Sequence, residues 1–196
     1  MILLATLSAM ATTVTLTNSP NACIDTYEVH PLVGEEDNLA AVKLTPPSYP
    51  ATVTAVTWSL AHGQFGGSSE PFCDAALEYE VLVFKSLSPA PPASPTIIET
   101  ITVPASSLPS TKAIYYYTET LSTPITLTVG EKLYVAVRLT GDPDTDVVCI
   151  SMCRNSDWRK RLNWWSYSDA APYPWDTMEN NYIYQNFIIE ASATIP

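Results

Sequence analysis

Residues 131–140, EKLYVAVRLT, carry the clearest structural signal in the chain, because apolar and polar side chains alternate along them. The first set is Leu133, Val135, Val137 and Leu139, and the second is Lys132, Tyr134, Arg138 and Thr140. Successive side chains of a β-strand point to opposite faces of its sheet. The stretch therefore predicts a strand with one face in a core and the other in water.

Similar alternation recurs on both sides of this stretch. In residues 77–85, LEYEVLVFK, both faces become apolar toward Phe84, and residues 183–195 predict a long final strand. Further strand candidates are TTVTLT (12–17), LAAVKLT (39–45), ATVTAVTWSL (51–60), PTIIETITV (95–103), AIYYYTETL (113–121) and ITLTV (125–129).

The segments between these strands are rich in Pro, Gly and Ser, which favours tight turns and extended loops. They are TPPSYP (45–50), HGQFGGSSEP (62–71), SLSPAPPASP (86–95), ASSLPS (105–110) and TGDPDTD (140–146). Eight to ten short strands with such turns predict an all-β, antiparallel β-sandwich of jelly-roll type, with a long aromatic-rich loop before the final strand. An immunoglobulin-like sandwich is the alternative, since Trp58 lies between Cys23 and Cys73.

A length of 196 residues suits one domain, which we place at residues 20–196. Residues 1–19 form an apolar N-terminal segment. It is either the remnant of an export signal, ending near Ala9-Met10-Ala11, or an edge or exchanged strand. No apolar run reaches the ~18 residues of a membrane-spanning helix.

The balance of charge is strongly acidic, with 20 Asp and Glu against 9 Lys and Arg and a formal net charge of −11. Such a charge disfavours nucleic acid and anionic membranes as partners, because both would be repelled. Residues 154–175 reverse this balance locally, because they hold four of the nine basic residues and four of the five tryptophans.

The four cysteines, Cys23, Cys73, Cys149 and Cys153, indicate two disulfides and an extracellular or cell-surface protein. We expect Cys149 to pair with Cys153 and Cys23 with Cys73, although three connectivities are formally possible. A zinc site is the weaker alternative, because neither histidine lies near the close pair Cys149 and Cys153.

Three stretches together resemble secreted bacterial jelly-roll modules of the broad carbohydrate-binding type. They are residues 78–108, EYEVLVFKSLSPAPPASPTIIETITVPASSL, residues 124–139, PITLTVGEKLYVAVRL, and residues 163–175, NWWSYSDAAPYPW. The resemblance implies an extracellular, non-catalytic sandwich that binds something on its loops or its concave face. It implies no particular ligand.

The aromatic and basic stretch supplies the candidate binding residues. They are Trp158, Arg159, Arg161, Asn163, Trp164, Trp165, Tyr167, Tyr173 and Trp175. Flat aromatic rings stack on sugar faces, and aromatic and arginine side chains also anchor protein interfaces. The same residues could instead pack the loop onto the sandwich. Because Trp164 and Trp165 are adjacent, a strand would direct them to opposite faces, with one buried and the other presented.

Signals for metal binding and catalysis are weaker. Asp142, Asp144 and Asp146 alternate as in calcium loops, so a structural calcium is an alternative to a plain acidic turn, and we expect no other cofactor. His62 is expected to be a surface-loop residue. Glu78 and Glu80 could in principle act as the two carboxylates of a glycosidase, but exposed acidic residues are common in so acidic a chain.

The sequence thus predicts a secreted, non-enzymatic binding module, with carbohydrate as the first ligand class and a protein surface as the second. The alternative is a self-assembling subunit of an extracellular filament or surface layer, in which residues 2–17 add as a strand to a neighbouring copy. A glycoside hydrolase is the third reading.

Overall fold

The computed structural model describes residues 11–18, 38–64, 72–142, 145–153, 162–168, 170–181 and 186–196. Its strands are β1 (Thr12–Thr17), β2 (Asn38–Leu44), β3 (Ala51–His62), β4 (Phe72–Cys73), β5 (Tyr79–Ser86), β6 (Ile97–Val103), β7 (Ala113–Leu127), β8 (Lys132–Leu139), β9 (Gly141–Asp142), β10 (Asp146–Val147), β11 (Cys149–Ile150), β12 (Met152–Cys153), β13 (Asn163–Ser166), β14 (Asp176–Thr177), β15 (Asn186–Phe187) and β16 (Ile189–Ile195). A single 3₁₀ turn, η1 (Met178–Asn181), is the helical element of the described chain, and no described helix is long and apolar enough to cross a membrane.

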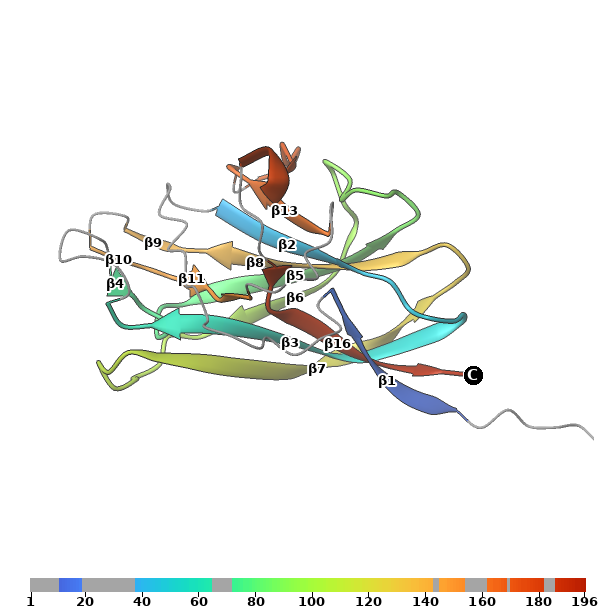
Figure 1. The fold of residues 1–196 in the computed structure, drawn as a ribbon, viewed down its shortest axis with the longest axis horizontal. Helices are drawn as coiled ribbons and strands as arrows, with labels where there is room; N and C mark the ends of the chain where they lie inside the picture. The colour runs from blue at the N-terminus through green and yellow to red at the C-terminus, as the bar shows by residue number, and fades with distance from the viewer. Residues whose placement is uncertain are drawn as a thin grey trace, which may run out of the picture.

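Two large antiparallel sheets form the body of the molecule (Figure 1). Two small sheets, β4-β10-β9 and β12-β15, accompany them. Sheet A has the order β1-β16-β3-β7, and the main part of sheet B has the order β2-β8-β5-β6. Among these eight strands, every step along the chain changes sheet except the one from β5 to β6. This eight-stranded arrangement is a jelly roll, as predicted, and it replaces the immunoglobulin-like alternative.

The core lies between the sheets and follows the predicted alternation. Val135 and Val137 of β8 are fully buried in the same cluster as Val56 and Trp58 of β3. The indole N–H of Trp58 donates to the Tyr79 hydroxyl at 2.8 Å, so this fully buried ring has a partner for its polar atom.

The prediction that the second face of residues 131–140 is wet is wrong at Tyr134. This side chain is fully buried on the outer face of sheet B, where its ring stacks on Phe84 with centroids 5.3 Å apart. A second hydrophobic cluster covers that outer face. Its buried members are Leu39, Ala41, Leu82, Phe84, Tyr134, Ala136, Trp164 and Tyr173.

A long insertion separates β8 and β16, the last two strands of the jelly roll. It contains β9 to β15, and its strand β13 extends sheet B by pairing with β2, while β14 pairs with β13. Figure 1 shows β13 beside β2 at one margin of the molecule, with β7 at the opposite margin. The aromatic stretch therefore contributes strands to the sheet rather than forming only a loop.

Two strand predictions are corrected at their ends. Residues 113–127 form the one strand β7 instead of two, and the final strand begins at Ile189, because Asn186 and Phe187 pair with β12 instead. At the other end of the chain, Thr12–Thr17 pairs along its whole length with β16. These residues therefore complete a sheet of their own chain.

Candidate functional site

The two adjacent tryptophans of β13 face opposite sides of sheet B, as the sequence predicts. Trp165 packs in the core between the sheets, and Trp164 packs in the outer cluster. The expectation that one of them is presented to solvent is wrong, because they are only 3% and 2% exposed. The added layer on the outer face buries the side chain that a bare sheet would expose.

That layer consists of the proline-rich loop, residues 86–96, and the segment 170–177. The Trp175 indole N–H donates to the carbonyl of Pro92 at 3.0 Å, and the Tyr173 backbone N–H donates to that of Ala93 at 2.6 Å. Proline has no N–H and fixes φ, so such a loop offers mainly carbonyls and a stiff backbone. Donors from the neighbouring segment therefore fasten it.

Side chains of sheet B fasten the same loop from beneath. The Tyr134 hydroxyl donates to the carbonyl of Ser88 at 2.8 Å, and the Lys132 ammonium donates to that of Leu87 at 2.7 Å. Burial raises the pKa of Tyr134 well above its usual range, so this hydroxyl remains a donor at physiological pH. The loop is held in one conformation by contacts along most of its length.

A pocket of about 300 Å³ lies between this loop and the turn that follows β14. Its lining residues are Pro89, Ala90, Trp164, Trp175, Asp176, Thr177 and Asn180. Two indoles thus meet a carboxylate, a hydroxyl and a carboxamide in one concave site. Ligand sites are commonly built this way, with apolar walls and a few placed polar groups.

The polar side of the pocket is fixed by hydrogen bonds within β14 and η1. Asp176 Oδ1 accepts from the backbone N–H of Thr177 at 2.8 Å and from the Asn180 carboxamide nitrogen. These bonds hold the Asp176 and Asn180 side chains next to each other, as parts of one preformed surface.

Lys43 of β2 supplies a positive charge beside the pocket. Its ammonium lies 5.2 Å from the centroid of the Trp164 ring and donates to the carbonyl of Pro89 at 3.0 Å. The contact is a cation–π interaction that also orients the loop wall. Lys43 and Asp176 place opposite charges near the site.

The other predicted binding residues have different positions. Asn163 is buried in a chain of amide hydrogen bonds, accepting from Asn18 at 2.9 Å and donating to Asn186 at 2.7 Å. Tyr173 is 7% exposed, whereas Tyr167 is 54% exposed and contacts the Trp165 ring edge. Trp158, Arg159 and Arg161 lie outside the described residues.

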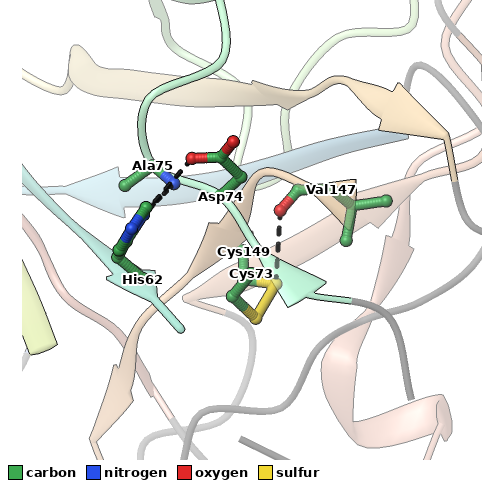
Figure 2. Close-up of a disulfide and its surroundings, with 6 residues drawn as sticks. All are labelled: His62, Cys73, Asp74, Ala75, Val147 and Cys149. Carbon is green, nitrogen blue, oxygen red and sulfur yellow. Dashed lines mark hydrogen bonds and ion pairs between the residues drawn. A yellow bond between two sulfur atoms is a disulfide. The ribbon is translucent and has the colours of Figure 1, made fainter. Parts of the chain in front are cut away.

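The predicted disulfide pairing is wrong. Cys73 of β4 is bonded to Cys149 of β11, with Cα atoms 5.3 Å apart (Figure 2). Cys149 and Cys153 lie on the short strands β11 and β12, and an extended stretch of that length places Cα atoms roughly 13 Å apart, too far for a disulfide. Cys153 is also disulfide-bonded, and Cys23 lies outside the described residues.

His62 is buried at the end of β3, contrary to its prediction as a surface-loop residue. Figure 2 shows its ring beside the turn after Cys73, where Nδ1 accepts from the Ala75 backbone N–H at 3.2 Å and lies 3.3 Å from Asp74 Oδ1. Asp74 Oδ1 also accepts from the Ala76 N–H at 2.8 Å. Both side chains hold a turn next to the disulfide, which is a structural role.

The aspartates predicted to bind calcium do not form a metal site within the described residues. Asp146 accepts a hydrogen bond from Thr145 at 2.8 Å, while Asp144 and the side chain of Asp142 lie outside the described part of the chain. Within that part, no three His, Cys, Asp or Glu side chains converge on one point. Of the two proposed glycosidase carboxylates, Glu80 forms an ion pair with Arg138 at 3.3 Å.

Sequence reasoning missed five residues of the pocket: Pro89, Ala90, Asp176, Thr177 and Asn180. Asp176 directly follows Trp175, and Asn180 comes one turn later. A polar residue next to an aromatic candidate was therefore the available signal for the polar wall of the pocket. Pro89 and Ala90 gave no such signal, because only the folded sheet brings their loop to residues 175–180.

The fold is similar to two solved structures, both at low sequence identity. One contains the cysteine protease and lectin-like domains of Cwp84, a surface-layer-associated protein of Clostridium difficile, with TM-score 0.54, 12% identity and coverage of 83% of this chain and 33% of that chain. The other is the clostridial cysteine protease Cwp84 after propeptide cleavage, with TM-score 0.54, 12% identity and coverage of 83% and 37%. The chain spans about a third of the length of these structures, and the likeness shows the fold alone.

Neither a protein-family model nor a curated protein matches the sequence.

Proposed function

We propose that this chain is a non-enzymatic carbohydrate-binding module that acts outside the cell, and that the pocket lined by Trp164, Trp175, Asp176 and Asn180 is its binding site. The observation that carries the proposal is the pocket itself. It combines indole surface with adjacent hydrogen-bonding side chains on a stiff, preformed frame.

A sugar ring suits this combination. Its C–H faces pack on aromatic rings, and its hydroxyls need hydrogen-bond partners once they leave water. The proline-rich loop and the turn after β14 are already held by hydrogen bonds, so they lose little conformational freedom on binding. This favours affinity for a small ligand. We therefore assign the apolar contact to Trp175 and the polar contacts to Asp176 and Asn180.

Two further observations support the proposal. A disulfide is typical of proteins outside the reducing cytosol. One of the similar solved structures contains a lectin-like domain and belongs to a surface-layer-associated protein. His62 is buried, and Glu80, one of the two candidate glycosidase carboxylates, is ion-paired with Arg138, which favours binding over hydrolysis.

The test is calorimetric titration of the full chain with a broad set of soluble mono- and oligosaccharides, with tryptophan emission as the second signal. At least one sugar should bind with a dissociation constant in the micromolar to millimolar range. Trp175→Ala should then abolish binding, because it removes the stacking surface and the bond to Pro92.

The matched control is Tyr167→Ala, which removes an exposed aromatic side chain that does not line the pocket. It should leave the affinity unchanged. Circular dichroism and unfolding curves establish that both variants are folded. Absence of binding across the set, or equal effects of the two variants, would refute this assignment.

The self-assembly alternative finds less support in the described residues. The described part of the N-terminal segment, Thr12–Thr17, is paired with β16 of its own chain, so strand addition through it would require breaking that ladder.

A further inference from the structure

Some hydrogen-bonding groups of the pocket already have partners within the protein and others do not. The groups that remain restrict which ligands can bind. This inference rests on the function proposed above and concerns the chemical class of sugar. On the polar wall, Asp176 Oδ1 is filled by the Thr177 N–H and the Asn180 carboxamide N–H. The second carboxylate oxygen of Asp176 and the carboxamide oxygen of Asn180 have no hydrogen-bond partner among the described contacts.

On the loop side, two donors near the pocket already have acceptors. The Trp175 indole N–H donates to Pro92, and the Lys43 ammonium donates one of its hydrogen bonds to Pro89. Asp176 and Asn180 therefore offer a pair of oxygen acceptors, held side by side by their mutual hydrogen bond. Two adjacent acceptors match two adjacent donors, and in a sugar these are neighbouring hydroxyl groups.

Charge decides between neutral and acidic sugars. An acidic sugar would place its carboxylate near Asp176 in a chain of net charge −11, so the two negative charges would repel each other. A neutral sugar meets no such repulsion.

We propose that the ligand is a neutral sugar that presents two neighbouring hydroxyl groups, which donate to Asp176 and Asn180 while its ring packs against Trp175. Asp176 is the main specificity-determining residue. Its carboxylate accepts the stronger, charge-assisted bond, and it also repels acidic analogues.

The experiment compares matched methyl hexopyranosides by calorimetry on the full chain. The set contains the neutral parent sugar that binds best, its monodeoxy analogues and the corresponding uronic acid. Removal of the hydroxyl that donates to Asp176 should weaken binding about 10- to 100-fold, because a hydrogen bond to a charged group is lost. The uronic acid should bind more weakly than the parent.

Asp176→Asn tests the assigned residue with little change in shape. It should weaken binding of the parent about tenfold and reduce the discrimination against the uronic acid. Glu119→Gln is the matched control, since it removes the same charge from an exposed position on β7 of sheet A. It should change neither quantity.

Tighter binding of the uronic acid, or unchanged affinities in Asp176→Asn, would overturn the inference. If such binding still required Trp175, the proposed carbohydrate-binding function would stand. If no sugar bound at all, both proposals would fall.

Discussion

The outer faces of the two sheets are built differently. Sheet B carries a second hydrophobic cluster beneath the proline-rich loop and residues 170–177, so Tyr134 and Phe84 are fully buried. On sheet A, polar side chains such as Thr57 and Thr118 face outward and share a hydrogen bond of 2.9 Å. The difference indicates where the molecule has gained structure beyond its jelly roll. The pocket lies on the face that has been covered.

The largest expected effect is a difference in the free energy of unfolding between a variant on the outer face of sheet B and one on the outer face of sheet A. Phe84→Ala should lower the free energy of unfolding by about 3–5 kcal/mol, because it leaves a cavity in a closed cluster. Thr118→Ala, on the outer face of sheet A, should change it by about 0.5 kcal/mol or less. Urea unfolding of both variants measures the contrast. Similar values for the two would show that the outer cluster is not a true core.

The second prediction concerns the end of sheet A that lies next to the disulfide. There Cys73, Cys149 and Ala61 form a small buried cluster around the disulfide. The sequence separation of 76 residues makes the bond an effective constraint on the unfolded chain, so Cys73→Ala with Cys149→Ala should cost about 2–4 kcal/mol.

Thermal unfolding under non-reducing conditions measures this loss. Cys153 keeps its own disulfide in the double variant, so the difference reports on one bond. A loss below about 0.5 kcal/mol would mean that the short strands β4 and β11 hold this end without it.

The contrast between the faces also explains what the sequence could predict. Strands such as residues 131–140 and 51–60 follow from their own alternation, and the jelly-roll class follows from their number and spacing. Tyr134 and Trp164 were misjudged because the segments that cover them are distant in sequence. Period-two alternation shows which way a side chain points, but not what another segment places over it.

The predictions of the disulfide pairing and of the pocket residues were incorrect for the same reason. Cys149 and Cys153 are close in sequence but extended in structure, while Cys73 approaches Cys149 only through the pairing of β4 with β10. Asp176 and Pro89 meet only because β13 adds to the edge of sheet B. Long-range strand pairing created both features, and a local pattern does not encode it.

A third, smaller effect tests how the covering layer is fastened. Tyr134→Phe keeps the buried ring and removes the hydroxyl that donates to Ser88. The free energy of unfolding should fall by about 1 kcal/mol, the usual net value of one hydrogen bond. Hydrogen exchange of residues 86–94 should accelerate while that of β3 stays unchanged. Equal acceleration in both segments would indicate general destabilisation instead of a loosened loop.

The smallest effect is expected at Glu131, in the turn between β7 and β8, where the sheets are joined by polar contacts. A hydrogen bond from the Thr128 backbone N–H, at 2.7 Å, and the Lys85 ammonium, at 3.1 Å, lower the pKa of the Glu131 carboxyl. A lowered pKa means that the folded state favours the charged form, so the stabilisation is present above the unfolded pKa and is lost as pH falls through the folded one.

Glu131→Gln should therefore cost about 0.5 kcal/mol at pH 7, since it weakens bonds to a partly exposed carboxylate. The difference from the wild-type chain should shrink as the pH falls below about 4, the ordinary range of a Glu side chain. Urea unfolding at pH 7, 5 and 3 measures it. A difference that stayed constant across this range would mean that the variant loses stability through a changed shape of the turn. The charge of Glu131 would then not contribute to the polar contacts between the sheets.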